Sequence, residues 1–310
     1  MESKAKKILI YKVRNFSEKF DDTFAFVREN WKVLFKYLTY LVLPVCLVQA
    51  VGLNSYMESV FDMSSVNSSR SSDVVSLLQN VGWSYGIIVL TSIIGAMLQL
   101  SVVYAYISYY NGSEDHLVDV AGSTFKPLLM KNLKRCGLAI LFWIGLSVLG
   151  IFVTVTLGYL LSWWILLPII LGVVAVAIPL MLFMPAYLLE DNPLFGALSK
   201  AIRLGFATWW GTFALILVLG FIVSFFQGIF AIPYYITVVV KTIMGLQGGS
   251  EFFDSAGYSF MTYLFGVLQS FATYLVGTIL AVGLAIQYGH ASEKIDHVTM
   301  EDNINRFEEL

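Results

Sequence analysis

The side chains that could do chemistry are few, and the histidines among them lie near the ends of apolar segments. His290, Glu293 and His297 are spaced so that a continuous helix would place all three on one face, where they could ligate a metal ion. Such spacing arises easily by chance, and solvated histidines beside a membrane are the interpretation that we favour. We therefore assign no metal site and no cofactor.

A second polar group surrounds His116, which lies among Glu114, Asp115 and Asp119. These residue types could do acid–base chemistry, but the sequence places neither a nucleophile nor an expected pocket beside them. We interpret the group as a loop at the membrane surface and expect no catalytic residue there. The protein is accordingly predicted not to be an enzyme.

Inside the apolar segments the polar side chains are neutral ones. Hydrogen bonding between helices is the role that we favour for them, and lining a substrate cavity is the alternative. Gln99, Gln227 and Gln269 are our candidates for either role. No ionisable group occupies the centre of a span, which argues against a proton-coupled pump.

Composition explains why the polar residues are so sparse. The 310 residues are 58% hydrophobic and 13% charged, with a mean hydropathy of +0.76. Residues 136–189 contain no Asp, Glu, Lys, Arg or His, and this run is long enough to cross a bilayer twice at about 20 residues a crossing. A net charge of −2 gives no reason to expect a nucleic-acid partner.

Hydropathy predicts an all-α polytopic membrane protein with six transmembrane helices. The expected spans are residues 33–51, 83–109, 137–159, 163–187, 210–231 and 263–288. A polar outer loop is expected over 52–82. The outer segment over 232–261 is less polar and could form a short helix on the outer surface, with Pro233 ending or bending the fifth span. Pro168, Pro179 and Pro185 predict a kink in the fourth span, which could open a cavity or could serve only the packing of the helices.

Charge predicts the orientation of these spans. Seventeen of the nineteen Lys and Arg residues fall at the ends and in the loops on one side, and only Arg70 and Lys241 fall on the other. Because Lys and Arg are retained on the cytoplasmic side, we expect both the N-terminus and the C-terminus in the cytoplasm.

Three segments with helical apolar spacing precede the odd-numbered spans, at residues 16–31, 117–133 and 193–207. In the first, Phe16, Phe24 and Trp31 belong to an apolar stripe, and Lys19 lies on the charged face expected to meet water. We interpret them as cytoplasmic interfacial helices. They predict a threefold tandem repeat of about 15–114, 115–191 and 192–293 within a single domain of 1–310, with residues 294–310 as a short tail. The alternative is that Tyr and charge recur at the interfaces of any membrane protein.

The stretch from Tyr187 through Glu190, Asp191, Asn192 and Pro193 to Ala201, with Trp209, Trp210 and Phe213 beyond it, resembles a known superfamily. This superfamily comprises the membrane domain attached to some bacterial glycerophosphodiester phosphodiesterases and its stand-alone relatives. The resemblance implies a bacterial cytoplasmic membrane protein. A catalytic barrel of about 250 residues has no room outside the spans, so no catalytic residue is carried over.

These patterns leave two functions open. The first is a non-catalytic role in the membrane, as an accessory or scaffold subunit or as a lipid-associated regulator. Its expected partners are membrane lipids, with a membrane protein or a second copy of the chain. The alternative is a carrier or flippase for a lipid-like or apolar substrate, which predicts that Gln99 or Gln227 lines a cavity of roughly 300 Å³ or more.

Overall fold

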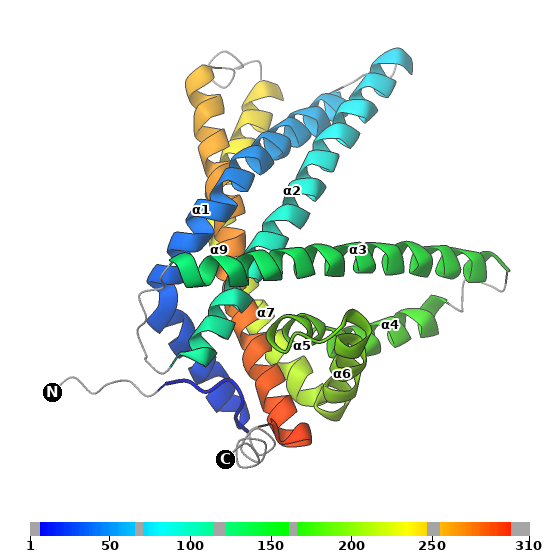
Figure 1. Cartoon of the computed structure of the whole chain (residues 1–310). Coiled ribbons are helices and arrows are strands. Elements are labelled where there is room, and N and C mark those ends of the chain that lie inside the picture. The colour runs from blue at the N-terminus through cyan, green and yellow to red at the C-terminus, as the bar shows by residue number, and fades with distance from the viewer. Residues whose placement is uncertain (1–6, 66–70, 114–121, 161–165, 247–254, 299–310) are drawn as a thin grey trace. The chain divides into compact units, whose positions relative to one another are not determined.

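A computed structural model describes residues 7–65, 71–113, 122–160, 166–246 and 255–298 (Figure 1). Within these ranges the chain forms helices and no strand. The helices are α1 (Phe16–Ser65), α2 (Ser71–Gly112), α3 (Gly122–Leu160), α4 (Leu166–Leu180), α5 (Phe183–Leu189), α6 (Leu194–Ala207), α7 (Trp209–Leu246) and α9 (Ala256–Asp296).

Six helical segments in the described residues are long and apolar enough to cross a membrane. They are Phe16–Phe61, Val75–Gly112, Phe125–Thr156, Leu167–Leu189, Trp209–Met244 and Ala256–Asp296. The predicted all-α architecture with six spans is thereby confirmed. A crossing takes about 30 Å, and the 50 residues of α1 extend for about 75 Å, so α1 is longer than its crossing.

Helix α1 corrects the prediction of a polar loop over 52–82. It continues to Ser65, and α2 already begins at Ser71. The serines expected in a loop are accommodated by bonding back to the helix, as the Ser59 hydroxyl does when it donates to the Ser55 carbonyl at 2.8 Å. Such bonds satisfy the short polar side chains without a break in the helix.

Helix α7 runs through Pro233 to Leu246, so the prediction that this proline could end the fifth span is wrong. The alternative of a bend at Pro233 stays a prediction. Packing explains the continuity. Tyr234 is fully buried, and its ring lies 3.4 Å from the position that a Cβ atom would take at Gly266 of α9. This contact holds the helix together where the proline removes one backbone hydrogen bond.

The fourth span is broken as its prolines predict. Helix α4 ends at Leu180, one residue after Pro179, and α5 begins at Phe183. Of the three segments predicted to be interfacial helices, the third is the separate helix α6, which follows Pro193, whereas residues 16–31 continue without a break into the rest of α1. The repeat and the interfacial position of these segments stay predictions.

The chain divides into two compact units. The first comprises Met1–Leu34, Leu100–Phe221 and Thr278–Leu310, and the second comprises Phe35–Gln99 and Ile222–Gly277. In the first, residues 281–292 of α9 are buried throughout. The backbone of the N-terminal segment lies against this helix at Gly289, where a Cβ atom would come within 2.1 Å of the Ile10 carbonyl oxygen.

One amide joins three helices of the second unit. Gln49 of α1 donates to Ser92 of α2 at 3.0 Å and accepts from the Tyr274 hydroxyl of α9 at 3.0 Å. Gly95 leaves room for the Tyr274 ring, which a Cβ atom at residue 95 would overlap. Polar bonds and close packing at small residues therefore join three helices here, as membrane interiors favour.

Candidate functional site

The first unit contains a cavity of about 420 Å³ between the start of α1, the α6–α7 junction and the end of α9. We call it the cationic pocket. Its lining residues are Lys19, Phe206, Ala207, Thr208, Trp209, Trp210, Gly211, His290 and Lys294. Three of the nine carry a basic side chain and none carries a carboxylate.

A capping box determines where Lys19 lies. The Asn15 side-chain oxygen accepts from the Glu18 backbone N–H, and the Glu18 carboxylate accepts from the Asn15 backbone N–H, both at 2.8 Å. Helix α1 therefore begins at Phe16, and Lys19 lies within its first turn. On the next turns of the same face, Thr23, Phe26 and Asn30 are buried, so Lys19 points into the protein.

His290 is held by the chain that precedes α1. Its Nδ1 accepts from the Arg14 backbone N–H at 3.0 Å, which leaves Nε2 as the nitrogen that carries the proton of the neutral ring. The Arg14 guanidinium donates to the Ile10 carbonyl at 2.9 Å and to Asp22 at 2.6 Å. Arg14 and Asp22 thus satisfy each other, and Arg14 fixes the side of the pocket formed by His290.

The interruption between α6 and α7 forms the opposite side. Thr208 donates from its hydroxyl to the Leu204 carbonyl at 2.9 Å, and α7 begins at the next residue. The amide of Gln287 donates to Thr212 at 2.9 Å. Gly211 lies between the two sides, because the position of its absent Cβ is 3.7 Å from the Lys19 ammonium and 3.9 Å from the Gln287 amide nitrogen.

The charges in the pocket are unbalanced. Lys19 is only 4% exposed, and Lys294 is exposed at the entrance. Neither ammonium has an ion-pair partner among the residues that the structure describes. Moving an ammonium out of water costs several kcal/mol unless an anion compensates it. The pocket is therefore suited to binding an anion.

Aromatic side chains form the rim on the α6–α7 side. Trp209 is anchored by its indole N–H, which donates to the Ala175 carbonyl of α4 at 3.0 Å, and by stacking on Phe213. Trp210 and Phe206 are 76% and 50% exposed. Exposed aromatic rings beside a cationic group are typical of the boundary between lipid and water.

The acids at the α5–α6 junction and the acid at the end of α9 are paired, in contrast to the pocket cations. Glu190 accepts from Lys200 at 2.5 Å, and Asp296 accepts from Arg203 at 2.7 and 2.9 Å. The hydrogen bonds from Arg203 to Asp296 raise the pKa of the guanidinium. Asp191 pairs with Lys131. These residues join helices and leave no charge available for a ligand.

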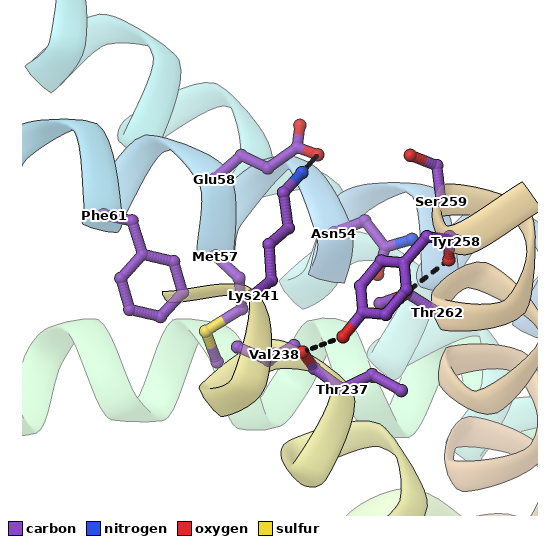
Figure 2. Close-up of a pocket in the computed structure, with 10 residues that line it drawn as sticks. All are labelled: Asn54, Met57, Glu58, Phe61, Thr237, Val238, Lys241, Tyr258, Ser259 and Thr262. Carbon is purple, nitrogen blue, oxygen red and sulfur yellow. Dashed lines mark hydrogen bonds and ion pairs between the residues drawn. The ribbon is translucent and has the colours of Figure 1, made fainter. Parts of the chain in front are cut away.

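Two further cavities are less suited to a charged ligand. An apolar cavity of about 390 Å³ in the first unit lies at the α4–α5 break, lined in part by Tyr104, Trp143 and Met181. The second unit contains a cavity of about 50 Å³, shown in Figure 2. There the Glu58–Lys241 ion pair spans 3.6 Å, so the charges balance, and the space holds only a few water molecules.

The glutamines singled out from the sequence lie outside all three cavities. Gln99 packs against Gly277, with its amide nitrogen 2.9 Å from the position of the absent Cβ. Gln227 donates to the Thr273 carbonyl of α9 at 3.2 Å, and the Gln269 side-chain oxygen is buried without a hydrogen bond. Their assignment to a cavity or to helix packing stays a prediction.

The histidines differ from their expected arrangement. Helix α9 ends at Asp296, and His297 adopts a left-handed backbone conformation with φ 51°, so it does not continue the helical face of His290 and Glu293. Within the described residues no group of three potential ligands could hold a metal ion. His116 and its acidic neighbours lie outside the described residues.

Lys19 is the residue that sequence reasoning misplaced. The apolar periodicity predicts a charged face in water that includes Lys19, whereas Lys19 is buried and Phe16, Phe24 and Trp31 of the apolar stripe are exposed. In a membrane protein the apolar face meets lipid and the polar face packs inward. The spacing of Lys19, Thr23 and Asn30 along one face was the signal that could have revealed this.

The fold is that of a multi-pass helical membrane protein, and its cationic pocket is bordered by exposed aromatic side chains. No protein-family model, no curated protein and no solved structure matches the chain.

Proposed function

We propose that this is a non-catalytic, lipid-associated membrane protein whose cationic pocket binds the phosphate of an anionic lipid headgroup. The observation that carries the proposal is the buried Lys19 ammonium, which has no anion beside it in the described chain. A bound phosphate would offset the cost of burying that charge, and charge-assisted hydrogen bonds are the stronger ones.

The rim favours a lipid over a soluble anion. Phe206 and Trp210 expose apolar rings beside the cations, so a ligand with both a phosphate and apolar chains gains from both. Helix α7 starts at the pocket, and its first residues add the positive end of a helix dipole. A soluble anion would gain from the charges alone.

The proposed setting is the cytoplasmic membrane of a bacterium, with both termini and the pocket on the cytoplasmic side. The Lys and Arg bias of the sequence supports this orientation. We also propose membership of the glycerophosphodiester phosphodiesterase membrane-domain superfamily, which the residues of the α5–α6 junction support. The role would be accessory or regulatory, with lipid as ligand and a membrane protein or a second copy of the chain as partner.

Lipid analysis by mass spectrometry tests the proposal. The full chain is extracted in native lipid discs as wild type, as the double variant Lys19→Gln/Lys294→Gln and as the control Lys32→Gln, which removes an exposed lysine from the same helix. We expect anionic lipids to be enriched with wild type and control and to fall to the bulk proportion with the double variant. Equal lipid content in all three would refute the headgroup site.

The carrier or flippase hypothesis is favoured by one separate observation, the apolar cavity at the α4–α5 break. Its size suits a substrate chain, since ligand cavities begin at about 300 Å³. The test is movement of fluorescent lipids between leaflets of vesicles that contain the purified protein. A rate that equals that of protein-free vesicles would exclude transport of those lipids.

A further inference from the structure

The charges and hydrogen-bond donors of the cationic pocket indicate which kind of phosphate group it prefers. Building on the proposed function, we infer that the pocket selects a headgroup that ends in a phosphate monoester, as in phosphatidic acid, over a phosphodiester headgroup, as in phosphatidylglycerol. The inference names the ligand class of the same site, so it depends on the pocket being a lipid site at all.

The charge of the pocket lining favours a phosphate monoester. The pocket contains two ammonium groups, Lys19 and Lys294, and no carboxylate in its lining. A phosphate monoester carries about −1.5 to −2 at pH 7, whereas a phosphodiester carries a single charge. Only the monoester balances both ammonium groups. A diester would leave one positive charge uncompensated next to a side chain that is 4% exposed.

The number of unengaged hydrogen-bond donors in the lining also favours a phosphate monoester. The other polar groups of the lining are already engaged, since Thr208 donates to the Leu204 carbonyl and the Trp209 indole donates to Ala175. The side-chain donors that remain are the two ammonium groups and Nε2 of His290, whose Nδ1 is used by Arg14. These three donor groups, on three separate side chains, match the three terminal oxygens of a monoester. A diester offers only two.

The space in front of the Lys19 ammonium favours a terminal phosphate. The Lys19 ammonium lies 3.7 Å from the position of the absent Cβ at Gly211, so the deepest donor is reached through space that a side chain there would fill. A terminal phosphate can approach this donor end-on. A diester carries a further group beyond its phosphorus, and that group would have to occupy the same space.

Calorimetric titration of the full-length protein in a non-ionic detergent at pH 7.5 tests the inference. The ligands are dioctanoyl phosphatidic acid, dioctanoyl phosphatidylglycerol, glycerol 3-phosphate and inorganic phosphate. We expect phosphatidic acid to bind roughly tenfold tighter than phosphatidylglycerol, as one additional charge-assisted bond would give. The two soluble phosphates should bind more weakly than phosphatidic acid because they lack apolar chains.

Variants distinguish the preference for a phosphate monoester from the existence of the headgroup site. Lys19→Gln should remove the preference for phosphatidic acid, Lys19→Arg should keep the charge and most of the preference, and Lys32→Gln should behave as wild type. Equal affinity for the two lipids in the wild type would overturn the inference and leave the headgroup site in place. Lipid binding that is unchanged in Lys19→Gln/Lys294→Gln would overturn both. Soluble phosphates that bind as tightly as phosphatidic acid would show that the ligand is a free phosphate.

Discussion

At the scale of single residues, Lys19 has an environment that differs from those of the other cations nearby. Arg14, Lys131, Lys200 and Arg203 each have a carboxylate within 4.0 Å, and Lys19, the most buried lysine among the described residues, has none there. Evolution of a stable fold alone would favour an apolar residue at such a position, because a buried charge is costly without a partner. The proposed headgroup site would account for this difference, because a bound phosphate would compensate the Lys19 ammonium.

We therefore predict that Lys19→Met stabilises the delipidated protein. Removing the buried ammonium should raise its stability by on the order of 1–3 kcal/mol, since Met fits a helix as well as Lys does. Thermal unfolding in detergent after lipid removal measures the change in Tm. Lys32→Met, at an exposed position on the same helix, should leave Tm nearly unchanged. A lower Tm for Lys19→Met would mean that the ammonium supports the fold.

At the scale of elements, the pocket depends on the N-terminal segment that precedes α1. This segment is held by the Ile8 backbone N–H, which donates to the Tyr110 hydroxyl at 3.0 Å, and by the Arg14 backbone N–H on His290. Its backbone reaches α9 because residue 289 is a glycine. The contact brings the beginning of the chain beside the end of the last span.

We predict that Gly289→Ala displaces this segment. The new Cβ would lie 2.1 Å from the Ile10 carbonyl oxygen, a backbone atom, so the two elements must move apart at a cost of about 1–3 kcal/mol. Limited trypsin digestion should then cleave faster after Lys12 and Arg14. Gly228→Ala is the control, because nothing lies within 4 Å of a Cβ there. Equal cleavage of the two variants would contradict the prediction.

At the scale of the whole molecule, an even number of spans predicts that the two ends of the chain lie on the same side of the membrane. The charge bias predicts that this side is the cytoplasm. This orientation would decide which leaflet supplies the lipid, because pocket residues lie on the N-terminal part of α1 and the C-terminal part of α9.

Reporter fusions in a bacterial host test the predicted orientation. A fluorescent protein after Leu310 should fold and fluoresce, and alkaline phosphatase at the same position should be inactive, because phosphatase needs an oxidising compartment for its disulfides. Phosphatase inserted between α3 and α4 should be active. The opposite pattern at both positions would reverse the orientation and move the pocket to the outer face.

Much of the architecture was predictable from local sequence. A run such as residues 136–189 has to form helices in a membrane, because only internal hydrogen bonds satisfy the backbone there. The break near Pro179 was predictable for the same local reason. The ends of the helices were not. The expected loop over 52–82 is largely helical in the described residues, because serine back-bonding outweighs its local signal, and α7 continues past Pro233 to Leu246, where Tyr234 is buried.

The amino-acid sequence by itself determined the class of protein, its number of spans and the sites of its proline breaks, since each depends on a contiguous stretch of chain. Only the tertiary structure decided that Lys19, Gly211 and Lys294 share one pocket and that Lys19 is buried. Burial depends on which helix faces meet, and that choice is made by packing between segments as far apart in sequence as Lys19 and Lys294.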